Sequence, residues 1–149
     1  MPDHVANIAR TDAGLASTLR VSVTRLTRRL RHERDASDDL SVHHLSVLAT
    51  LWRNGEMSIG DLAASEKVQP PSMTRTVNAL CERGLVARTA RPDDKRIVVI
   101  DLTEDAQKVL EDSRRRKEAW LNRQLAELTP AERQILRDAA PILERLSRA

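Results

Sequence analysis

The sequence predicts a mainly α-helical protein with one small β-hairpin. Apolar residues recur at the period of a helix face through much of the 149-residue chain. The exception is RPDDKRIVVIDLT, residues 91–103, in which a charged turn leads into the β-branched run Ile97–Ile100. Such a run favours a strand rather than a helix. Helices are predicted on both sides of this hairpin.

A long amphipathic helix is predicted near the N-terminus. Its apolar face is formed by Leu15, Leu19, Val23, Leu26 and Leu30. The sequence ASDD at residues 36–39 interrupts the pattern, and Ser41 can cap a second helix that stops at Asn54 and Gly55. The apolar side of this second helix consists of Val42, Leu45, Leu48, Ala49 and Trp52.

Two shorter helices are predicted next. Ser58 and Asp61 have the layout of a capping box, and the helix that they open ends near Lys67. A proline pair suits the first turn of the following helix, residues 70–83, and Gly84 can supply its left-handed stop. Two helices joined by a short turn form a helix-turn-helix.

The hairpin and two further helices follow. Its strands are predicted at Leu85–Thr89 and Ile97–Leu102, and Thr103 starts a helix that runs to about residue 128. The sequence TPAE at residues 129–132 is a start signal for the last helix. Pro141 lies inside that helix and is expected to kink or split it near residue 137.

Composition and motifs exclude several classes of protein. The single Cys81 cannot form an intramolecular disulfide, and the histidines have no zinc-site spacing; His43 and His44 point about 100° apart on a helix. No apolar run approaches the roughly 18 residues that span a bilayer, and no signal peptide is evident, so a cytoplasmic protein without membrane contact is expected. Glycine-rich loops and catalytic signatures are missing, so we expect no enzyme, cofactor or metal.

Basic residues cluster in two segments. Residues 17–34 carry a net charge of +5 and residues 67–96 a net charge of +4, whereas residues 35–66 carry −5. The balanced charges of the last 53 residues are typical of solvated helix faces. Cations gathered on a helix-turn-helix and a hairpin suit a polyanion, and the scarcity of aromatic residues argues against a single-strand binder.

The helix at 70–83 carries side chains that can read base edges in a major groove. Arginine can bind guanine, asparagine or glutamine can bind adenine, and an apolar side chain can contact the thymine methyl group. The candidates are Ser58, Gln69, Ser72, Met73, Thr74, Arg75 and Asn78. Met73 or Val77 is also a candidate for the core with Leu80. Polar residues on a helix are usually only solvated, but their place between a proline pair and a charged hairpin favours DNA.

Residues 58–103, SIGDLAASEKVQPPSMTRTVNALCERGLVARTARPDDKRIVVIDLT, resemble the winged helix-turn-helix core of the MarR family of bacterial transcription regulators. The motifs are DLA in the first helix, SMTR at the opening of the recognition helix, L-x-x-x-G-L-V before the wing, and D-x-R followed by an apolar strand and LT. The flanking helices match as well. The resemblance implies a winged helix-turn-helix domain at 38–103 between helical dimerisation regions at 1–37 and 104–149.

The resemblance also implies a homodimeric repressor that binds a pseudo-palindromic double-stranded DNA operator. Recognition helix 70–83 would enter the major groove, and wing 90–97 would reach the minor groove or the backbone. The candidate DNA-binding residues of the wing are Arg91, Lys95 and Arg96. Asp94 is expected to hold an arginine or the turn, because a carboxylate near phosphates is repelled.

Many members of the family bind small aromatic acids, which weaken DNA binding, in a crevice between the dimer helices and the winged domain. The candidates for such a site here are Arg20, His44, Leu48 and Trp52. The simpler interpretation, with Trp52 in the core and His44 a packed histidine, is favoured. Cys81 lies at the end of the recognition helix and is expected to be passive rather than a thiol sensor.

A second hypothesis keeps this fold but gives it a different role. The winged domain would then be a protein-interaction or ligand-sequestering module without specific DNA binding. Salt-dependent binding to duplex DNA would separate the two hypotheses, because only a DNA-binding protein displaces counterions from phosphates.

Overall fold

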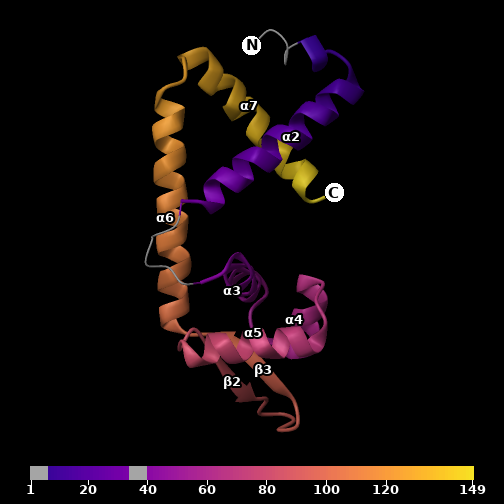
Figure 1. Cartoon of the computed structure of the whole chain (residues 1–149), viewed down its shortest axis with the longest axis vertical. Coiled ribbons are helices and arrows are strands. Elements are labelled where there is room, and N and C mark those ends of the chain that lie inside the picture. The colour runs from indigo at the N-terminus through magenta and orange to yellow at the C-terminus, as the bar shows by residue number, and fades with distance from the viewer. Residues whose placement is uncertain (1–6, 34–39) are drawn as a thin grey trace. The chain divides into compact units, whose positions relative to one another are not determined.

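The computed structural model describes residues 7–33 and 40–149, and its elements are shown in Figure 1. These residues fall into two compact units, one formed by residues 7–33 and 115–149 and the other by residues 40–114. The first part of helix α6, Glu104–Ala126, therefore groups with the second unit. The break expected at ASDD and the domain boundary expected at residue 37 lie outside the described residues.

The second unit is a helix-turn-helix with a three-stranded antiparallel sheet. Its elements before α6 are α3 Val42–Asn54, β1 Met57–Ser58, α4 Ile59–Glu66, α5 Pro70–Glu82, β2 Val86–Ala90 and β3 Val98–Leu102. The strand order is β1-β3-β2, with Met57 opposite Ile100 and Val86 opposite Leu102. The predicted helix-turn-helix and hairpin are confirmed. Strand β1 was not predicted, because two residues are too few to show a period.

Local sequence signals mark the starts and ends of these helices at the predicted residues. The Ser58 hydroxyl caps α4 by accepting a hydrogen bond from the Asp61 N–H at 3.1 Å. Gly55 and Gly84 have φ angles of +76° and +69°, the left-handed region in which glycine is not strained. Lys67 adopts φ +55° without being a glycine, and this residue starts the turn that leads from α4 to α5.

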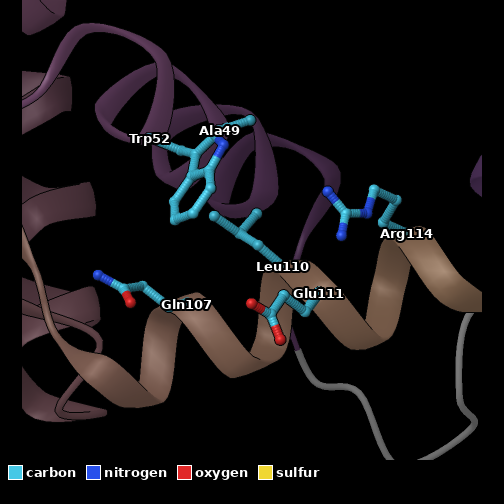
Figure 2. A pocket seen from close by; sticks show the side chains of 6 residues that line it. All are labelled: Ala49, Trp52, Gln107, Leu110, Glu111 and Arg114. Atoms are coloured by element: carbon cyan, nitrogen blue, oxygen red, sulfur yellow. The ribbon is translucent and has the colours of Figure 1, made fainter.

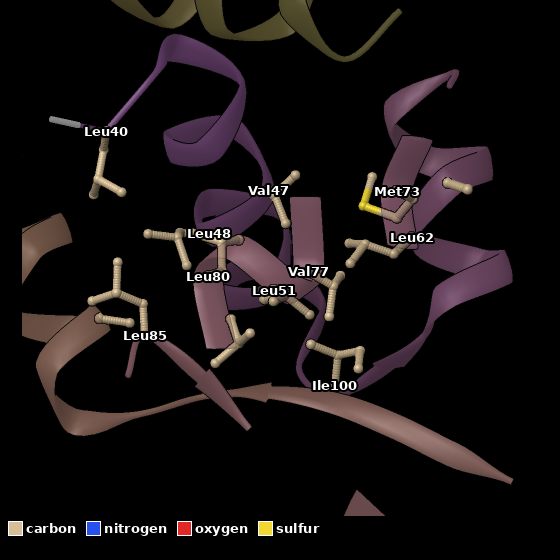
Figure 3. Packing of buried hydrophobic residues seen from close by; sticks show 13 residues of the cluster. Leu40, Val47, Leu48, Leu51, Leu62, Met73, Val77, Leu80, Leu85 and Ile100 are labelled. Atoms are coloured by element: carbon tan, nitrogen blue, oxygen red, sulfur yellow. The ribbon is translucent and has the colours of Figure 1, made fainter. Parts of the chain in front are cut away.

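The hydrophobic core of this unit lies between α3, α4, α5 and the sheet (Figure 3). Its completely buried side chains include Val47, Leu48, Leu51, Leu62, Met73, Val77, Leu80 and Ile100. The apolar face predicted for α3 is only partly correct, because Val42 and Trp52 are 46% and 54% exposed. Val47 and Leu51 of α3, which the predicted face does not include, are buried in the core instead.

Thr103 joins the end of the recognition helix to the start of α6. Its hydroxyl donates to the Gly84 carbonyl at 2.7 Å and accepts from the Ala106 N–H at 3.3 Å. Its own N–H donates to the Leu85 carbonyl at 3.1 Å. Three hydrogen bonds on one residue therefore connect the hairpin, α5 and α6, where the sequence predicts only a helix cap.

The first unit contains α2, Asp12–Arg31, and α7, Pro130–Ser147, with the rest of α6. Neither α2 nor α7 has a buried residue. The predicted capping box of α7 is confirmed, because the Thr129 hydroxyl accepts from the Glu132 N–H and the Glu132 carboxylate accepts from the Thr129 N–H. Of the kink or split expected at Pro141, the split is wrong, because α7 is continuous from Pro130 to Ser147. The kink stays a prediction.

Candidate nucleic-acid interface

Helix α5 has one buried side and one open side. Met73, Thr76, Val77 and Leu80 are buried. The open side carries Pro71, Arg75, Asn78 and Glu82, all exposed and spaced by four, three and four residues. This spacing places them in a single strip along the helix, which we call the outward strip. Because the buried side is fixed in the core, the outward strip is presented on a rigid support.

The predicted base-reading residues differ in how accessible their side chains are. Gln69 is the N-cap residue of α5; it is exposed and its side chain makes no cap hydrogen bond. Ser72 and Thr74 are half-buried, and the Thr74 hydroxyl donates to the Pro70 carbonyl at 3.0 Å. The Arg75 side chain makes no hydrogen bond or ion pair with any residue that the structure describes. Its donors are therefore available.

Met73 does not belong to the interface. Its side chain is completely buried among core residues on the opposite side of α5, so a contact with a base edge is excluded in this fold. The alternative interpretation, with Met73 in the core, is correct. Ser58 is half-buried and its hydroxyl oxygen accepts the cap hydrogen bond of α4, so it supports the helix-turn-helix. Its contact with DNA stays a prediction.

The first turn of α5 offers no free backbone donor. Pro70 and Pro71 have no N–H, and the N–H groups of Ser72 and Met73 both donate to the Gln69 carbonyl, at 3.0 and 3.1 Å. Many helix N-termini bind phosphate through unpaired N–H groups. The first turn of α5 has no unpaired N–H group for this purpose, so any hydrogen bond between this turn and DNA must come from side chains.

No pattern in the sequence indicates that Arg88 of β2 contacts α5. One guanidinium nitrogen, Nη2, donates to the amide oxygen of Asn78, and Nη1 lies 3.7 Å from the Cys81 sulfur. An exposed arginine on a hairpin strand is usually a solvated side chain, and no sequence pattern ties it to a position ten residues earlier. Only the packing of β2 beside α5 brings these groups together.

Asp94 organises the turn of the wing. Its carboxylate accepts three hydrogen bonds from Arg96: from the backbone N–H at 3.0 Å, from Nε at 3.1 Å and from Nη2 at 3.3 Å. These bonds hold the pKa of Asp94 below its ordinary value. The turn is closed by the Ile97 N–H, which donates to the Asp94 carbonyl at 3.0 Å, and by the Arg91 N–H, which donates to the Ile97 carbonyl at 2.9 Å.

Most charges of the wing are paired within it. Arg91 Nε lies 3.1 Å from Asp93, and Arg96 is bound to Asp94. The Lys95 side chain makes no ion pair with any described residue. Exposed ion pairs contribute little stability, so these arginines can turn to phosphate oxygens at small cost. The Arg96 side chain, 91% exposed, is the most accessible of the paired cations.

The comparisons with known proteins agree with this geometry. The MarR family model matches residues 40–98. An uncharacterized HTH-type transcriptional regulator of Mycobacterium bovis is 42% identical over 132 residues, which cover 89% of this chain and 92% of the relative. The chain belongs to the MarR family. MdtR of Bacillus subtilis, named an HTH-type transcriptional repressor, is 30% identical over 105 residues, which cover 70% of this chain and 66% of MdtR.

The solved structures give the same fold. A protein of Pseudomonas aeruginosa PA01, described as a candidate transcriptional regulator, is 33% identical with a TM-score of 0.81, and the match covers 94% of this chain and 98% of that one. The predicted family and the predicted mainly α-helical winged helix-turn-helix fold are therefore confirmed. This MarR-family chain is a DNA-binding transcription regulator, and its relatives are named as regulators rather than enzymes.

The four residues suggested as ligand contacts of this MarR-family chain lie in different surroundings within their own units. Leu48 is completely buried in the core of the winged unit, and Arg20 lines a groove of the other unit. Trp52 is not in the core, which corrects the simpler interpretation of this residue. It lies beside a cavity of about 160 Å³ between α3 and α6 (Figure 2). The lining residues are Ala49, Trp52, Gln107, Leu110, Glu111 and Arg114.

His44 stabilises the start of α3. Its Nδ1 accepts a hydrogen bond from the Ser41 N–H at 3.3 Å, and the Ser41 hydroxyl accepts from the His44 N–H at 3.1 Å. Partial burial, together with the positive charge of Arg83 and the neighbouring His43, lowers the pKa of His44. The neutral imidazole is therefore the form that caps the helix.

Two kinds of feature are absent from the described residues. Residues 7–33 and 40–149 contain no group of three or more histidine, cysteine, aspartate or glutamate side chains able to hold a metal ion. In the same part of the chain, every helix is too short or too polar to cross a membrane.

We predict that His44 makes stability depend on pH. Because its native pKa is lowered, the unfolded chain binds the proton more tightly. This contribution to stability is present above the unfolded pKa of about 6.5 and is lost as the pH falls through the lowered native pKa. His44→Gln keeps an acceptor at the capping position and should flatten this part of the curve. The measurement is urea unfolding from about pH 7.5 to 5. The control is His43→Gln, which should keep most of the dependence because burial and the charge of Arg83 remain. Equal curves for the wild type and His44→Gln would contradict the assignment.

Proposed function

We propose that this chain is a homodimeric, sequence-specific repressor that binds a pseudo-palindromic double-stranded operator. Helix α5 lies in the major groove, and wing 90–97 lies against the minor groove or the backbone. The observation that supports this best is the outward strip of α5. It carries hydrogen-bonding side chains on a helix whose other side is completely buried, and wing 90–97 beside it carries three exposed cations.

The side chains divide into two roles. Gln69, Arg75 and Asn78, with the half-buried Ser72 and Thr74, face base edges. The cations of the wing, Arg91, Lys95 and Arg96, contact phosphates or the minor groove. Base contacts carry sequence information, whereas phosphate contacts set affinity and its salt dependence. Arg75 is the strongest candidate for a base contact, because its side chain is exposed and unengaged among the described residues.

A second copy of this chain would cover the apolar surface of the first unit. A groove of about 630 Å³ is lined by Leu19, Val23 and Leu26 of α2 and by Leu143 and Leu146 of α7. Five large apolar side chains of α7 are between 41% and 65% exposed. Apolar patches of this kind mark protein interfaces. A two-fold dimer would place two α5 helices in successive major grooves, about 34 Å apart.

Repression follows if the bound dimer occupies a promoter, and the name of the relative MdtR as a repressor supports this direction. Release by a small aromatic ligand is supported by the cavity beside Trp52. Its volume of about 160 Å³ is close to the roughly 150 Å³ of a cavity that takes up one benzene ring. The cavity lies between α3, which packs in the core of the winged unit, and α6, so a ligand there could change the support of α5.

We predict that Arg75→Ala and Arg96→Ala impair DNA binding in different ways. Arg75→Ala should relax the preference at one operator position by about 1 to 3 kcal/mol, because a base contact is lost. Arg96→Ala should weaken binding to all duplexes and lower the salt slope by about 1, because a phosphate contact is lost. Binding-site selection from genomic fragments supplies the operator, and fluorescence anisotropy at several salt concentrations gives the affinities. If the wild type binds operator and random duplex equally, the chain has no sequence specificity and the alternative role as an interaction module gains support.

We predict that Leu143→Asp dissociates the dimer. A carboxylate in the apolar groove would have to be buried without a partner, which costs several kcal/mol. Analytical ultracentrifugation should show a monomer and a loss of operator affinity. Gln134→Asp places the same charge on a polar, exposed position of α7 and should remain dimeric. A wild type that sediments as a monomer would refute the homodimer.

We predict that benzoate binds beside Trp52 and weakens operator binding. In the Trp120→Phe variant, Trp52 is the only remaining tryptophan, so its fluorescence reports the cavity alone. Benzoate should change that fluorescence and release the operator, and Trp52→Ala should abolish the release. Cyclohexanecarboxylate has the same charge without an aromatic ring and is the control ligand. If neither compound alters the fluorescence at millimolar concentration, the cavity takes no such effector.

A further inference from the structure

Arg88 of β2 bonds to a residue that faces the proposed DNA site. It is exposed, pairs with Ile100 in the sheet register, and extends its guanidinium to α5. Nη2 donates to the Asn78 amide oxygen, and Nη1 lies 3.7 Å from the sulfur of Cys81, one turn further along the helix. The hairpin thus packs beside α5 and, through Arg88, also holds the side chain of Asn78 in the outward strip.

The chemistry of the two groups determines how the Asn78 amide is turned. An arginine side chain has hydrogen-bond donors and no acceptor, whereas an asparagine side chain has one oxygen acceptor and one NH₂ donor. The amide oxygen must therefore face Arg88. The NH₂ group then points away from Arg88, on an exposed residue of the outward strip. A hydrogen bond from a charged donor is stronger than one between neutral groups, so this orientation is well held.

We propose that Arg88 is a positioning residue that makes Asn78 a hydrogen-bond donor toward DNA, so that α5 selects a keto base at the position which Asn78 faces. The preferred partners are O6 of guanine and O4 of thymine. This inference rests on the proposed function, because it requires α5 to lie in the major groove.

The inference reverses the usual expectation for an asparagine on a recognition helix. A free asparagine can read adenine with two bonds, accepting from the N6 amino group through its oxygen and donating to N7. Here the oxygen is engaged by Arg88, so adenine keeps only the bond to N7, and an NH₂ group that faces the exocyclic position would meet another amino group on adenine or cytosine. Donor facing donor is unfavourable, so both amino bases are disfavoured at this position.

An alternative role for Arg88 is a direct phosphate contact, and the two roles predict different measurements. A phosphate contact affects all sequences equally and adds about 1 to the salt slope. A positioning residue alters the order of preference among bases and leaves the salt slope on random duplex unchanged.

The test uses the 149-residue chain and four operator duplexes that differ only at the base pair where Asn78→Ala changes the preference. The wild type should bind the keto duplexes about tenfold more tightly than the amino duplexes, the range expected for a major-groove contact. Arg88→Ala should reduce this ratio to below about threefold, mainly by improving binding to adenine, because the amide is then free to turn. In the Asn78→Ala background, Arg88→Ala should cause no further change in preference.

Two further variants separate positioning from charge and from folding. Arg88→Lys keeps the positive charge but loses the planar fork, and it should also lose most of the preference. Lys108→Ala removes one positive charge from an exposed position of α6 and should keep the preference. Circular dichroism melts show whether each variant is folded. If Arg88→Ala does not fold, Arg88→Lys provides the test.

The inference is overturned if Arg88→Ala or Arg88→Lys keeps the wild-type order of the four duplexes. It is also overturned if Arg88→Ala weakens all four equally and lowers the salt slope, or if Asn78→Ala changes no base preference. In each of these cases the proposed repressor remains intact as long as the wild type distinguishes operator from random duplex. A wild type that makes no such distinction refutes the proposed function itself.

Discussion

The candidate interface depends on the packing of one side of α5. Met73, Val77 and Leu80 are completely buried, and each such side chain contributes about 1.5 to 3 kcal/mol when it leaves water. Since the same helix carries the outward strip, core packing sets the direction in which every base-reading side chain points. The Thr103 hydrogen bonds extend this constraint to the end of α5, because they fix Gly84 and Leu85 against the start of α6.

Two polar side chains of the interface are oriented by bonds within the protein. Asp94 holds Arg96 in the wing, and Arg88 turns the amide of Asn78. The first turn of α5 has no free N–H, so backbone groups do not substitute for these side chains. Net charge therefore describes this surface poorly. DNA would meet an Asn78 amide whose direction is set in advance, beside Arg75 and Lys95, which are unengaged among the described residues. Preorganisation of the amide lowers the entropy lost on binding.

The first unit differs from the winged unit in how little it buries. Helices α2 and α7 contain no buried residue, although both carry apolar residues at helical spacing. An amphipathic helix gains most of its stability from packing rather than from helix propensity. The apolar groove between α2 and α7 would remain in contact with water in a single chain. This unit therefore needs a partner surface more than the winged unit does, which is the physical basis of the proposed dimer.

The sequence by itself determined the elements whose signals are local. The serine and threonine caps, the glycine stops, the proline pair at the start of α5 and the β-branched run of the hairpin act within a few residues. Each helix and strand that they predict lies close to its expected position in the structure. The family motifs likewise lie within one continuous stretch, residues 58–103. Composition and charge clustering pointed to DNA because they need no knowledge of contacts.

The tertiary structure decided the features that depend on neighbours distant in the sequence. A helix period shows that α5 and α3 have apolar residues, but only packing decided that Met73 lies in the core and that Trp52 lies beside a cavity. Pairing with β3 created strand β1, and the approach of β2 to α5 joined Arg88 to Asn78. These outcomes depend on which surfaces meet, and a linear pattern of residue types does not contain that information.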